Sequence, residues 1–529
     1  MTSTLLRTKK EMIDNKFAVM KFVSRHKLLF ACLIIAWIIG MIFTVFLINR
    51  SGRTKMKVQR MSSHPLIHPL QHNRLPPSSS FKMVKALRYC NPPNDIIPGQ
   101  EGKSPVNGSL ELVAVIVRHG DRAPLRPIRN QSIINCGTQN SPILLKYLKT
   151  LKHLRGSAKH LFPFTTFPLH PGEKHCTSAQ MTLLGAHQHL MVGQVLKKAY
   201  IEDHGLLGKN WSSDDIKLYS TIYSRTYQSA VAFLFGFLPS FNISNIKIIP
   251  SADTRFCMTD YYCNCPLAAQ LESQTNKKLK RLLQSHPAVL NLLGRLSPIV
   301  KYHPNHSDIL DPFEMFDSLM GYVCHGSHLP CIPGTNKCVT FEHVRNLIAF
   351  LDWEGRQFIR DSSNVKAAML NMQGFFIHLL SSMKSYINKK DRARFMLYSG
   401  HDVTLEPLST ALGINDGNMI PYASRIVFEL YSHTVNSKLN YVLKILFNGK
   451  DVTKYTSFCK PYFKDSSRKL PRSSEYGMCP FESFRKYVED FILAMSASSF
   501  QAACNVAQAT SNPFDVRYGS YVDESYKPD

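Results

Sequence analysis

The stretch Val113–Pro124, VAVIVRHGDRAP, runs from apolar residues directly into two arginines and a histidine. A continuous apolar run such as Leu112–Val117 is typical of a parallel strand that is buried on both faces of a sheet. In open α/β sheets, ligands bind at the carboxyl ends of strands, where helix N-termini present free amide groups to anions. We therefore expect the charged residues to mark a binding site at an edge of the sheet.

Two later segments repeat this order of strand, charged residue and helix. Residues 216–224 predict a strand and residues 226–238 a helix, with Arg225 at their junction. Residues 394–399 (RFMLYS) predict another strand, and residues 400–404 (GHDVT) lead into a helical pattern. The expected site contains six residues: Arg118, His119, Arg122, Arg225, His401 and Asp402. Three guanidinium groups are planar donors suited to a tetrahedral oxyanion, so the pattern predicts phosphate or sulfate recognition.

Four segments resemble the histidine acid phosphatase family. RHGDRAP at 118–124 is similar to the family signature RHGxRxP, and SGHD at 399–402 resembles its second motif. QMTLLGAHQ at 180–188 resembles a family helix of pattern Q-L-T-x-x-G-x-x-Q. YSRTYQSA at 223–230 resembles the segment that carries a further phosphate-binding arginine. The matches occur in the family's order and cover about residues 110–450.

The resemblance implies a phosphoglycerate-mutase-like α/β fold, with a mixed sheet core, a mainly α-helical cap and no metal or other cofactor. It implies that His119 is the nucleophile and that Asp402 donates a proton to the leaving oxygen. The implied phosphate-binding residues are Arg118, Arg122, Arg225 and His401. Nearby guanidinium groups disfavour protonation of His119, which suits attack on phosphorus. Asp121 is expected to orient an arginine or to be exposed, and is left out of the catalytic set.

Residues 28–48 (LLFACLIIAWIIGMIFTVFLI) contain no charged residue and are long enough to span a bilayer. A cleaved signal peptide is the alternative, but the run exceeds a usual signal-peptide core and no small-residue cleavage pattern follows Asn49. Both flanks are basic, so local charge hardly separates the two orientations. We expect a cytosolic tail at 1–27, a transmembrane anchor at 28–48 and a lumenal remainder, which is the type II topology.

Sequons and cysteines favour this orientation. Five Asn-x-Ser sequons follow the anchor, at Asn107, Asn130, Asn210, Asn242 and Asn305. Twelve of the thirteen cysteines lie on the same side, enough for six disulfides of unassigned connectivity. Both features favour an oxidising, glycosylating compartment. A zinc site is the alternative for two cysteine groups, Cys257, Cys263 and Cys265, and Cys324, Cys331 and Cys338. The absence of paired C-x-x-C spacing and of HExxH disfavours it.

The net charge of +27 is unevenly distributed along the 529 residues. Residues 1–89 hold sixteen Lys and Arg against two acidic residues, so about half of the net charge lies there. Residues 49–89 are rich in Ser, Pro and basic residues and predict a solvated stem, with attraction of sulfated glycans or phospholipid as the alternative. Residues 90–529 form the expected phosphatase domain, with its cap at about 256–373.

An anchor, a stem and a lumenal domain are the layout of Golgi glycan-processing enzymes. Within the family, the chain is similar to the branch that acts on the glycosaminoglycan–protein linkage region. This similarity implies removal of the 2-O-phosphate from xylose on a proteoglycan core protein, and linkage-region glycosyltransferases such as the glucuronosyltransferase as partners. Nucleic acid is not an expected partner.

Residue spacing alone does not specify the glycan. An inositol phosphate or a lysophospholipid is the alternative substrate for a secretory-pathway phosphatase with a basic surface. A catalytically silent scaffold that binds anionic glycan is the alternative from another class of protein. The pairing of His119 with Asp402 argues against the scaffold, because binding alone needs neither a nucleophile nor a proton donor.

Overall fold

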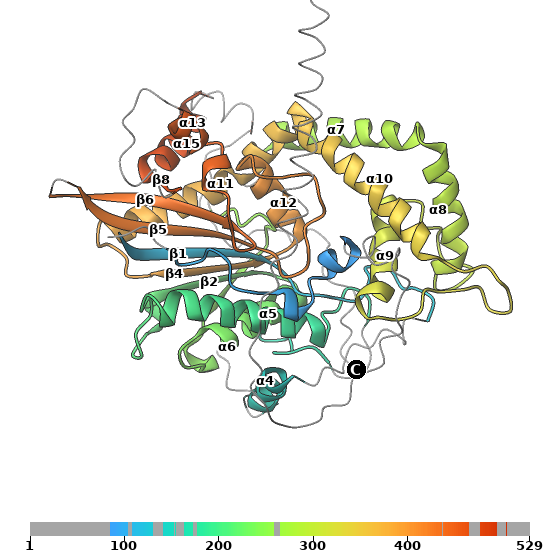
Figure 1. Cartoon of the computed structure of the whole chain (residues 1–529), viewed down its shortest axis with the longest axis horizontal. Helices are drawn as coiled ribbons and strands as arrows, with labels where there is room; N and C mark the ends of the chain where they lie inside the picture. Colours follow the sequence, from blue (N-terminus) through green and yellow to red (C-terminus); the bar gives the residue numbers. More distant parts are fainter. Residues whose placement is uncertain are drawn as a thin grey trace, which may run out of the picture. The chain divides into compact units, whose positions relative to one another are not determined.

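A mixed sheet forms the centre of the fold (Figure 1). Its strand order is β3-β2-β4-β1-β5-β6-β7, and β8 pairs with β6. The strands are β1 (Gly108–Arg118), β2 (Ile216–Thr221), β3 (Ile248–Ser251), β4 (Phe395–Gly400), β5 (Arg425–Val435), β6 (Lys438–Phe447), β7 (Lys450–Asp451) and β8 (Cys479–Pro480). The strands β3, β2, β4 and β1 run parallel, and the strands from β5 onward pair antiparallel. The α/β class and the mixed sheet predicted from the sequence are confirmed.

The computed structural model describes residues 85–103, 108–130, 141–152, 154, 163–172, 177–258, 265–435, 437–464, 477–494 and 504. All of them fall within one unit, Leu75–Asp529. The predicted tail, the predicted anchor at 28–48 and nearly all of the predicted stem lie outside the described residues. Among the described residues, no helix is both long and apolar enough to cross a membrane.

Two groups of helices cover the two faces of the sheet (Figure 1). One group is α5 (Leu183–Leu196) and α6 (Ser224–Phe237); the other is α11 (Ser362–Ile387), α12 (Asp402–Ala411) and α15 (Phe481–Ala494). Val113, Val115 and Val117 of β1 pack in the core with α5 and α6, and the residues between them pack in the core with α11 and α12. Successive strand residues point to opposite faces, so both faces of β1 are buried, as its apolar run predicts.

Helices α7–α10 form a separate group, in which α8, α9 and α10 share an apolar core and α7 packs its Ala268 with Leu370 of α11 (Figure 1). They are α7 (Pro266–Gln284), α8 (Pro287–Val300), α9 (Pro312–Cys324) and α10 (Phe341–Arg360). Leu296, Phe316 and Leu347 are fully buried within this shared core. The end of the range predicted for the cap, at 373, falls inside α11, whose Met372 packs in the sheet core instead. Two further α-helices are α4 (Pro142–Lys152) and α13 (Lys460–Lys464).

The strand predicted at 216–224 ends three residues early, at Thr221, and α6 begins at Ser224. The Thr226 hydroxyl contacts the carbonyl oxygens of Thr221 at 3.0 Å and Tyr223 at 2.9 Å. These side-chain hydrogen bonds compete with continued strand pairing and support the turn into the helix. Arg225 therefore lies in the first turn of α6, rather than at a junction before it.

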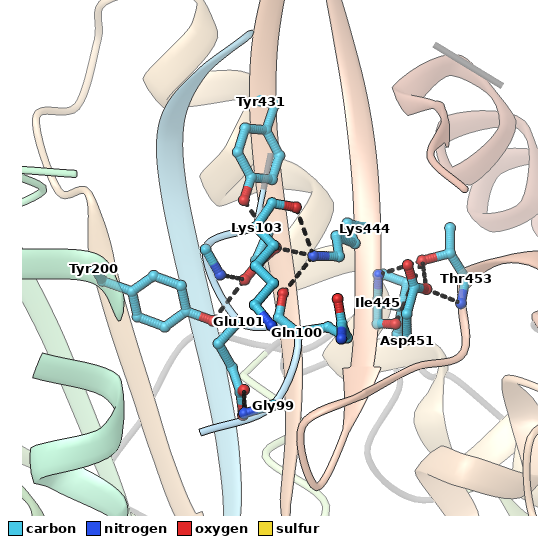
Figure 2. A network of polar contacts seen from close by, with 12 residues as sticks. Gly99, Gln100, Glu101, Lys103, Tyr200, Tyr431, Lys444, Ile445, Asp451 and Thr453 are labelled. Carbon is cyan, nitrogen blue, oxygen red and sulfur yellow. Dashed lines mark hydrogen bonds and ion pairs between the residues drawn. The ribbon is translucent and has the colours of Figure 1, made fainter. Parts of the chain in front are cut away.

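The segment 99–103 is fastened to the sheet by buried charged residues (Figure 2). The Glu429 carboxylate accepts hydrogen bonds from the Gly102 amide at 2.8 Å and the Tyr200 hydroxyl at 2.7 Å. Lys444 Nζ lies 3.6 Å from Glu429 and donates to two backbone carbonyls of the segment. Arg425 pairs with Glu101, and both side chains are almost fully buried. The segment therefore packs against β5 and β6 through buried charges of opposite sign that pair with one another.

Four disulfides occur among the described residues: Cys90–Cys324, Cys265–Cys504, Cys331–Cys338 and Cys459–Cys479. Cys257 is also disulfide-bonded, and Cys263 lies outside the described residues. The zinc alternative is therefore wrong for every cysteine of the two groups that the structure describes. Disulfides of this number favour an oxidising compartment.

Four of the predicted sequon asparagines are exposed: Asn130, Asn210, Asn242 and Asn305. Asn107 lies outside the described residues. An exposed asparagine is accessible to a glycosylating enzyme, so the four positions remain suitable acceptors.

Candidate active site

All six residues of the predicted site line one cavity of about 720 Å³: Arg118, His119, Arg122, Arg225, His401 and Asp402. The parallel register of β1 and β4 places Arg118 beside Gly400. His401 is the N-cap residue of α12 and Asp402 is its first residue. The cavity therefore lies at the carboxyl edge of the parallel strands, where the sequence predicts it.

Arg118 is fully buried and is held by contacts from several segments. Its Nη2 atom lies 2.9 Å from Asp402 Oδ2 and 3.0 Å from the Tyr89 hydroxyl, and its Nη1 atom donates to the Ile420 carbonyl. The guanidinium also lies over the Tyr422 ring, 4.4 Å from its centroid. These contacts fix the orientation of a permanent positive charge at the cavity wall.

Arg122 is held from the cap by Asp317 of α9. The two nitrogens of its guanidinium lie 2.9 and 3.2 Å from the two Asp317 carboxylate oxygens, which is a bidentate pair. The Nε atoms of Arg118 and Arg122 are buried and have no hydrogen-bond partner in the described part of the chain. A buried donor without a partner is costly, and a bound anion would satisfy such donors.

Sequence reasoning missed Asp317. Its signal is a single acidic residue in the apolar run MFDSLMGYV, where a buried carboxylate requires a cationic partner. The pair joins the cap to the loop that follows β1, so the cap positions a residue of the cavity wall.

His119 presents one ring nitrogen with a free lone pair. Its Nδ1 lies 2.8 Å from the Gly120 carbonyl oxygen, which can only accept, so Nδ1 carries the hydrogen in the neutral ring. The lone pair is then on Nε2. Burial lowers the pKa of His119 well below its usual value, and the charges of Arg225 and Arg118 lower it further. The imidazole is therefore neutral under mildly acidic conditions, as the surrounding arginines predict.

His401 is oriented by β2. Its Nε2 lies 2.8 Å from the Thr221 hydroxyl, and its backbone amide donates to Thr404 Oγ1 at 3.0 Å. Its ring meets the His119 ring edge-on, with centroids 5.4 Å apart. Burial and the charge of Arg225 hold the pKa of His401 well below its usual value. Thr221 was not predicted from the sequence as a site residue.

Asp402 is partly accessible from the cavity, with 27% of its side chain exposed. Burial opposes its ionisation, but the charges of Arg118 and Arg122 outweigh burial and lower its pKa to about 2. Its Oδ1 also accepts a hydrogen bond from the Val403 amide at 2.9 Å. Without a bound anion, Asp402 is therefore a carboxylate.

Asp121 is buried and pairs with no arginine of the described part of the chain, so the expectation for it was wrong. It is 1% exposed, and its Oδ2 contacts His325 Nε2 at 2.8 Å and accepts from the Thr182 hydroxyl at 2.6 Å. Thr182 is the N-cap of α5. Asp121 fastens the loop after β1 to α5 and to the C-terminal end of α9, because the loop is too closely packed to leave its side chain in solvent.

The segment 180–188 supports the same loop. Gln188 accepts a hydrogen bond from the Asp121 amide at 2.7 Å and donates to the Cys90 carbonyl at 2.6 Å. A Cβ on Gly120 would lie 2.4 Å from the Gly185 carbonyl oxygen, so neither segment leaves room for a side chain at this crossing. The motif at 180–188 therefore acts by positioning the loop that carries His119.

The chain matches the family model "Histidine phosphatase superfamily (branch 2)" over residues 109–311 and 355–448. It is 31% identical over 445 residues to 2-phosphoxylose phosphatase 1 of Mus musculus, with 81% of this chain and 88% of that protein covered. It is 23% identical over 448 residues to lysophosphatidic acid phosphatase type 6 of Homo sapiens, covering 80% of this chain and 95% of that protein. Among solved structures, a phytase of Klebsiella sp. ASR1 is 14% identical, with a TM-score of 0.42 over 73% of this chain and 96% of that chain. The chain belongs to branch 2 of the histidine phosphatase superfamily and is a phosphoric monoester hydrolase.

Proposed function

We propose that this phosphatase removes the 2-O-phosphate from xylose in the glycosaminoglycan–protein linkage region of proteoglycans, in the Golgi lumen. The observation that carries the substrate is the similarity to 2-phosphoxylose phosphatase 1 of five vertebrates, at 28–31% identity over 81–84% of this chain. The similarity covers both the cavity wall and the cap, so it extends beyond the residues that hold a phosphate.

In the proposed reaction, His119 Nε2 attacks phosphorus and the bond from phosphorus to the sugar oxygen breaks. Asp402 gives its proton to that oxygen, since an alkoxide is a poor leaving group. Water then attacks the phosphohistidine, its proton passes to Asp402, and the bond from phosphorus to nitrogen breaks to release inorganic phosphate. Arg118, Arg122 and Arg225 offset the charge on the phosphoryl oxygens during both transfers.

The low pKa of Asp402 sets a condition on this mechanism. A carboxyl group with a pKa of about 2 is ionised in the empty cavity. A phosphate monoester has a second pKa near 6, and its dianion would raise the pKa of an adjacent carboxyl group. Binding a monoanion to the carboxylate is equivalent to binding a dianion to the acid. The substrate can therefore bring the proton that Asp402 later donates.

The remaining sequence features support a lumenal location. Exposed sequon asparagines and disulfides suit a phosphatase domain at 90–529 that follows a tail at 1–27, an anchor at 28–48 and a stem at 49–89. In this proposal the partner is the phosphorylated glycan on its core protein. Linkage-region glycosyltransferases such as the glucuronosyltransferase are the proposed protein partners.

A lysophospholipid is the second candidate substrate. Apolar side chains form part of the cavity wall, among them Leu279, Phe313, Leu351 and Phe358. An acyl chain would bury against such a surface. The similarity to a lysophosphatidic acid phosphatase also points to this class.

The test uses the full-length chain in detergent, with His119→Ala as control. Phosphate release is measured from a linkage-region glycopeptide with 2-phosphoxylose, from lysophosphatidate and from inositol hexakisphosphate. We expect the highest kcat/KM for the glycopeptide and no release by the variant. Preference for lysophosphatidate or the inositol phosphate would overturn the glycan substrate but not the mechanism. Glycopeptide binding without any phosphate release would favour the scaffold.

A further inference from the structure

The cavity has two ends that differ in chemistry. One end contains the histidines and three arginines described above. The other end is lined by α7, α10, the second turn of α12 and the loop after α12, and includes Glu272, Leu279, Glu354, Phe358, Glu406 and Asn415. Because the phosphoryl group occupies the first end, the second end faces the group that leaves.

The second end offers little positive charge. The cationic lining residues of the whole cavity are Arg118, Arg122, Arg225 and Arg255, with no lysine among the described residues. Arg255 lies at this end, since its partner Asn371 at 2.7 Å also contacts Glu272, and its charge is paired with Asp253 at 3.2 Å. A leaving group that carries further phosphates would meet carboxyl groups there, and like charges at close range are unfavourable.

Glu406 is placed to contact the leaving group directly. It follows Asp402 by four residues in α12, so the two side chains share one helix face with Cβ atoms about 5–6 Å apart. Glu406 Oε1 contacts the Thr410 hydroxyl at 3.2 Å and Asn415 Nδ2 at 3.4 Å. Its Oε2 accepts no hydrogen bond from the described residues, so it is available to a ligand in the cavity.

We propose that Glu406 is a specificity-determining residue that binds the sugar hydroxyl next to the phosphorylated position. The proposal rests on the proposed function, in which Asp402 contacts the ester oxygen. Only then does the separation between Asp402 and Glu406 locate the neighbouring sugar hydroxyl. The hydroxyl on the adjacent sugar carbon then lies within the length of one helical turn from Asp402. Glu406 lies one turn along α12 from Asp402, so it can reach that hydroxyl. A neutral, hydroxylated leaving group satisfies this carboxyl group, whereas an aryl or acyl group does not.

The ionisation of Glu406 suits this role. Burial raises its pKa to about 7, and the charges of Asp402 and Glu272 act in the same direction. Near that pH the group exists as both acid and carboxylate, so it can donate to a hydroxyl oxygen or accept from a hydroxyl hydrogen.

The test pairs a change in the enzyme with a change in the substrate. The full-length chain and Glu406→Ala are compared on methyl β-xyloside 2-phosphate and on its 3-deoxy analogue. We expect loss of the 3-hydroxyl to lower kcat/KM about tenfold in the wild type, the size of one hydrogen bond to a charged group, and less than about twofold in the variant. If loss of the 3-hydroxyl lowered kcat/KM by the same factor in the wild type and in Glu406→Ala, the proposal would be overturned.

Two further variants keep the test decisive. Glu406→Gln retains a donor and an acceptor, so it should show an intermediate penalty for the 3-deoxy analogue. Glu342→Ala, at an exposed position of α10, should show the full wild-type penalty. Hydrolysis of p-nitrophenyl phosphate by a wild type that leaves both xylosides intact would overturn the proposed substrate and this proposal together. Hydrolysis of both xylosides with equal factors would overturn only the role of Glu406.

Discussion

Two buried charged clusters of this sheet differ in charge balance. In the cluster that fastens segment 99–103, Arg425 pairs with Glu101, and Lys444 lies beside Glu429. Lys444 also donates to the Gln100 and Lys103 carbonyls (Figure 2). At the carboxyl edge of β1 and β4, three arginines of the cavity wall are accompanied by two carboxylates. These five residues are Arg118, Arg122, Arg225, Asp402 and Asp317.

The difference separates a structural from a functional arrangement of charge. Removing an ion from water costs several kcal/mol, which good geometry and additional hydrogen bonds must offset. The first cluster meets this requirement within the chain, because the Glu429 and Glu101 carboxylates accept from the backbone and from neighbouring side chains. The second cluster retains excess positive charge and buried donors without partners in the described chain, and an anionic substrate would complete it.

Among the variants that keep His119, Asp402→Asn is expected to have the largest effect on turnover. The variant keeps a side chain of the same size but cannot donate the proton, so kcat for an alkyl phosphate should fall about 10²–10⁴-fold. The rate of phosphorylation by p-nitrophenyl phosphate should fall much less, because its leaving group needs little protonation. Rapid mixing with each substrate, followed by trapping of the phosphoenzyme, measures both steps. Equal losses on the two substrates, or no labelled protein, would contradict the assigned roles.

Changing Lys444 to Met tests the balanced cluster. The substitution leaves the Glu429 carboxylate buried without its cation, which should lower the free energy of unfolding by about 3–5 kcal/mol. Urea unfolding of the full-length chain in detergent measures this loss. The kcat/KM of the folded variant should match the wild type, because Lys444 lies outside the cavity wall.

The double variant Lys444→Met, Glu429→Gln is the control for this loss. It removes the uncompensated charge and should recover part of the stability. A Lys444→Met variant that is as stable as the wild type would show that the charges of the balanced cluster do not stabilise the fold. The contrast drawn between the two clusters would then be wrong.

Local sequence patterns predicted the part of the site that depends on strand ends. Leu112–Val117 is apolar because both faces of β1 are buried, and the chain can become charged only where the strand leaves the core. The same logic predicted His401 and Asp402. Arg225 lies inside the first turn of α6 rather than before the helix, because the Thr226 hydroxyl contacts the carbonyls that would otherwise extend the strand.

The supporting residues could not be predicted in this way. Arg122 and Asp317 are 195 positions apart, and their pairing depends on how the cap packs against the loop after β1. Tyr89 and Thr221 are ordinary residues in the sequence and acquire a role only through the partners that the fold brings to them. The sequence located the cap by position alone, and the leaving-group end of the cavity emerged only from the structure.

The pH dependence of kcat/KM tests whether the unbalanced cluster takes its proton from the substrate. One proton is shared between Asp402 and the bound phosphate, so kcat/KM should fall about tenfold per pH unit above a pH near 6, the second pKa of the ester. The value of kcat/KM should stay constant from pH 6 down to pH 5, because burial and nearby arginines keep the pKa of His119 well below its usual value. A constant kcat/KM from pH 6 to pH 8 would contradict the shared proton. The Asp402→Asn variant, assayed with p-nitrophenyl phosphate, provides the control.

The smallest expected effect comes from Thr221→Val, which keeps the shape of the side chain and removes the hydroxyl that contacts His401. Loss of one neutral hydrogen bond corresponds to about 0.5–1.5 kcal/mol, or a fall of about two- to tenfold in kcat/KM. Because the hydroxyl orients His401, a proposed phosphate ligand, rather than touching the leaving group, the same factor should apply to alkyl and aryl phosphates. Thr221→Ser keeps the hydroxyl and should restore most of the rate. A Thr221→Val variant with wild-type kinetics would show that the N-cap position of α12 alone orients His401. The excess positive charge of the cavity, rather than the orientation of each side chain, would then determine kcat/KM.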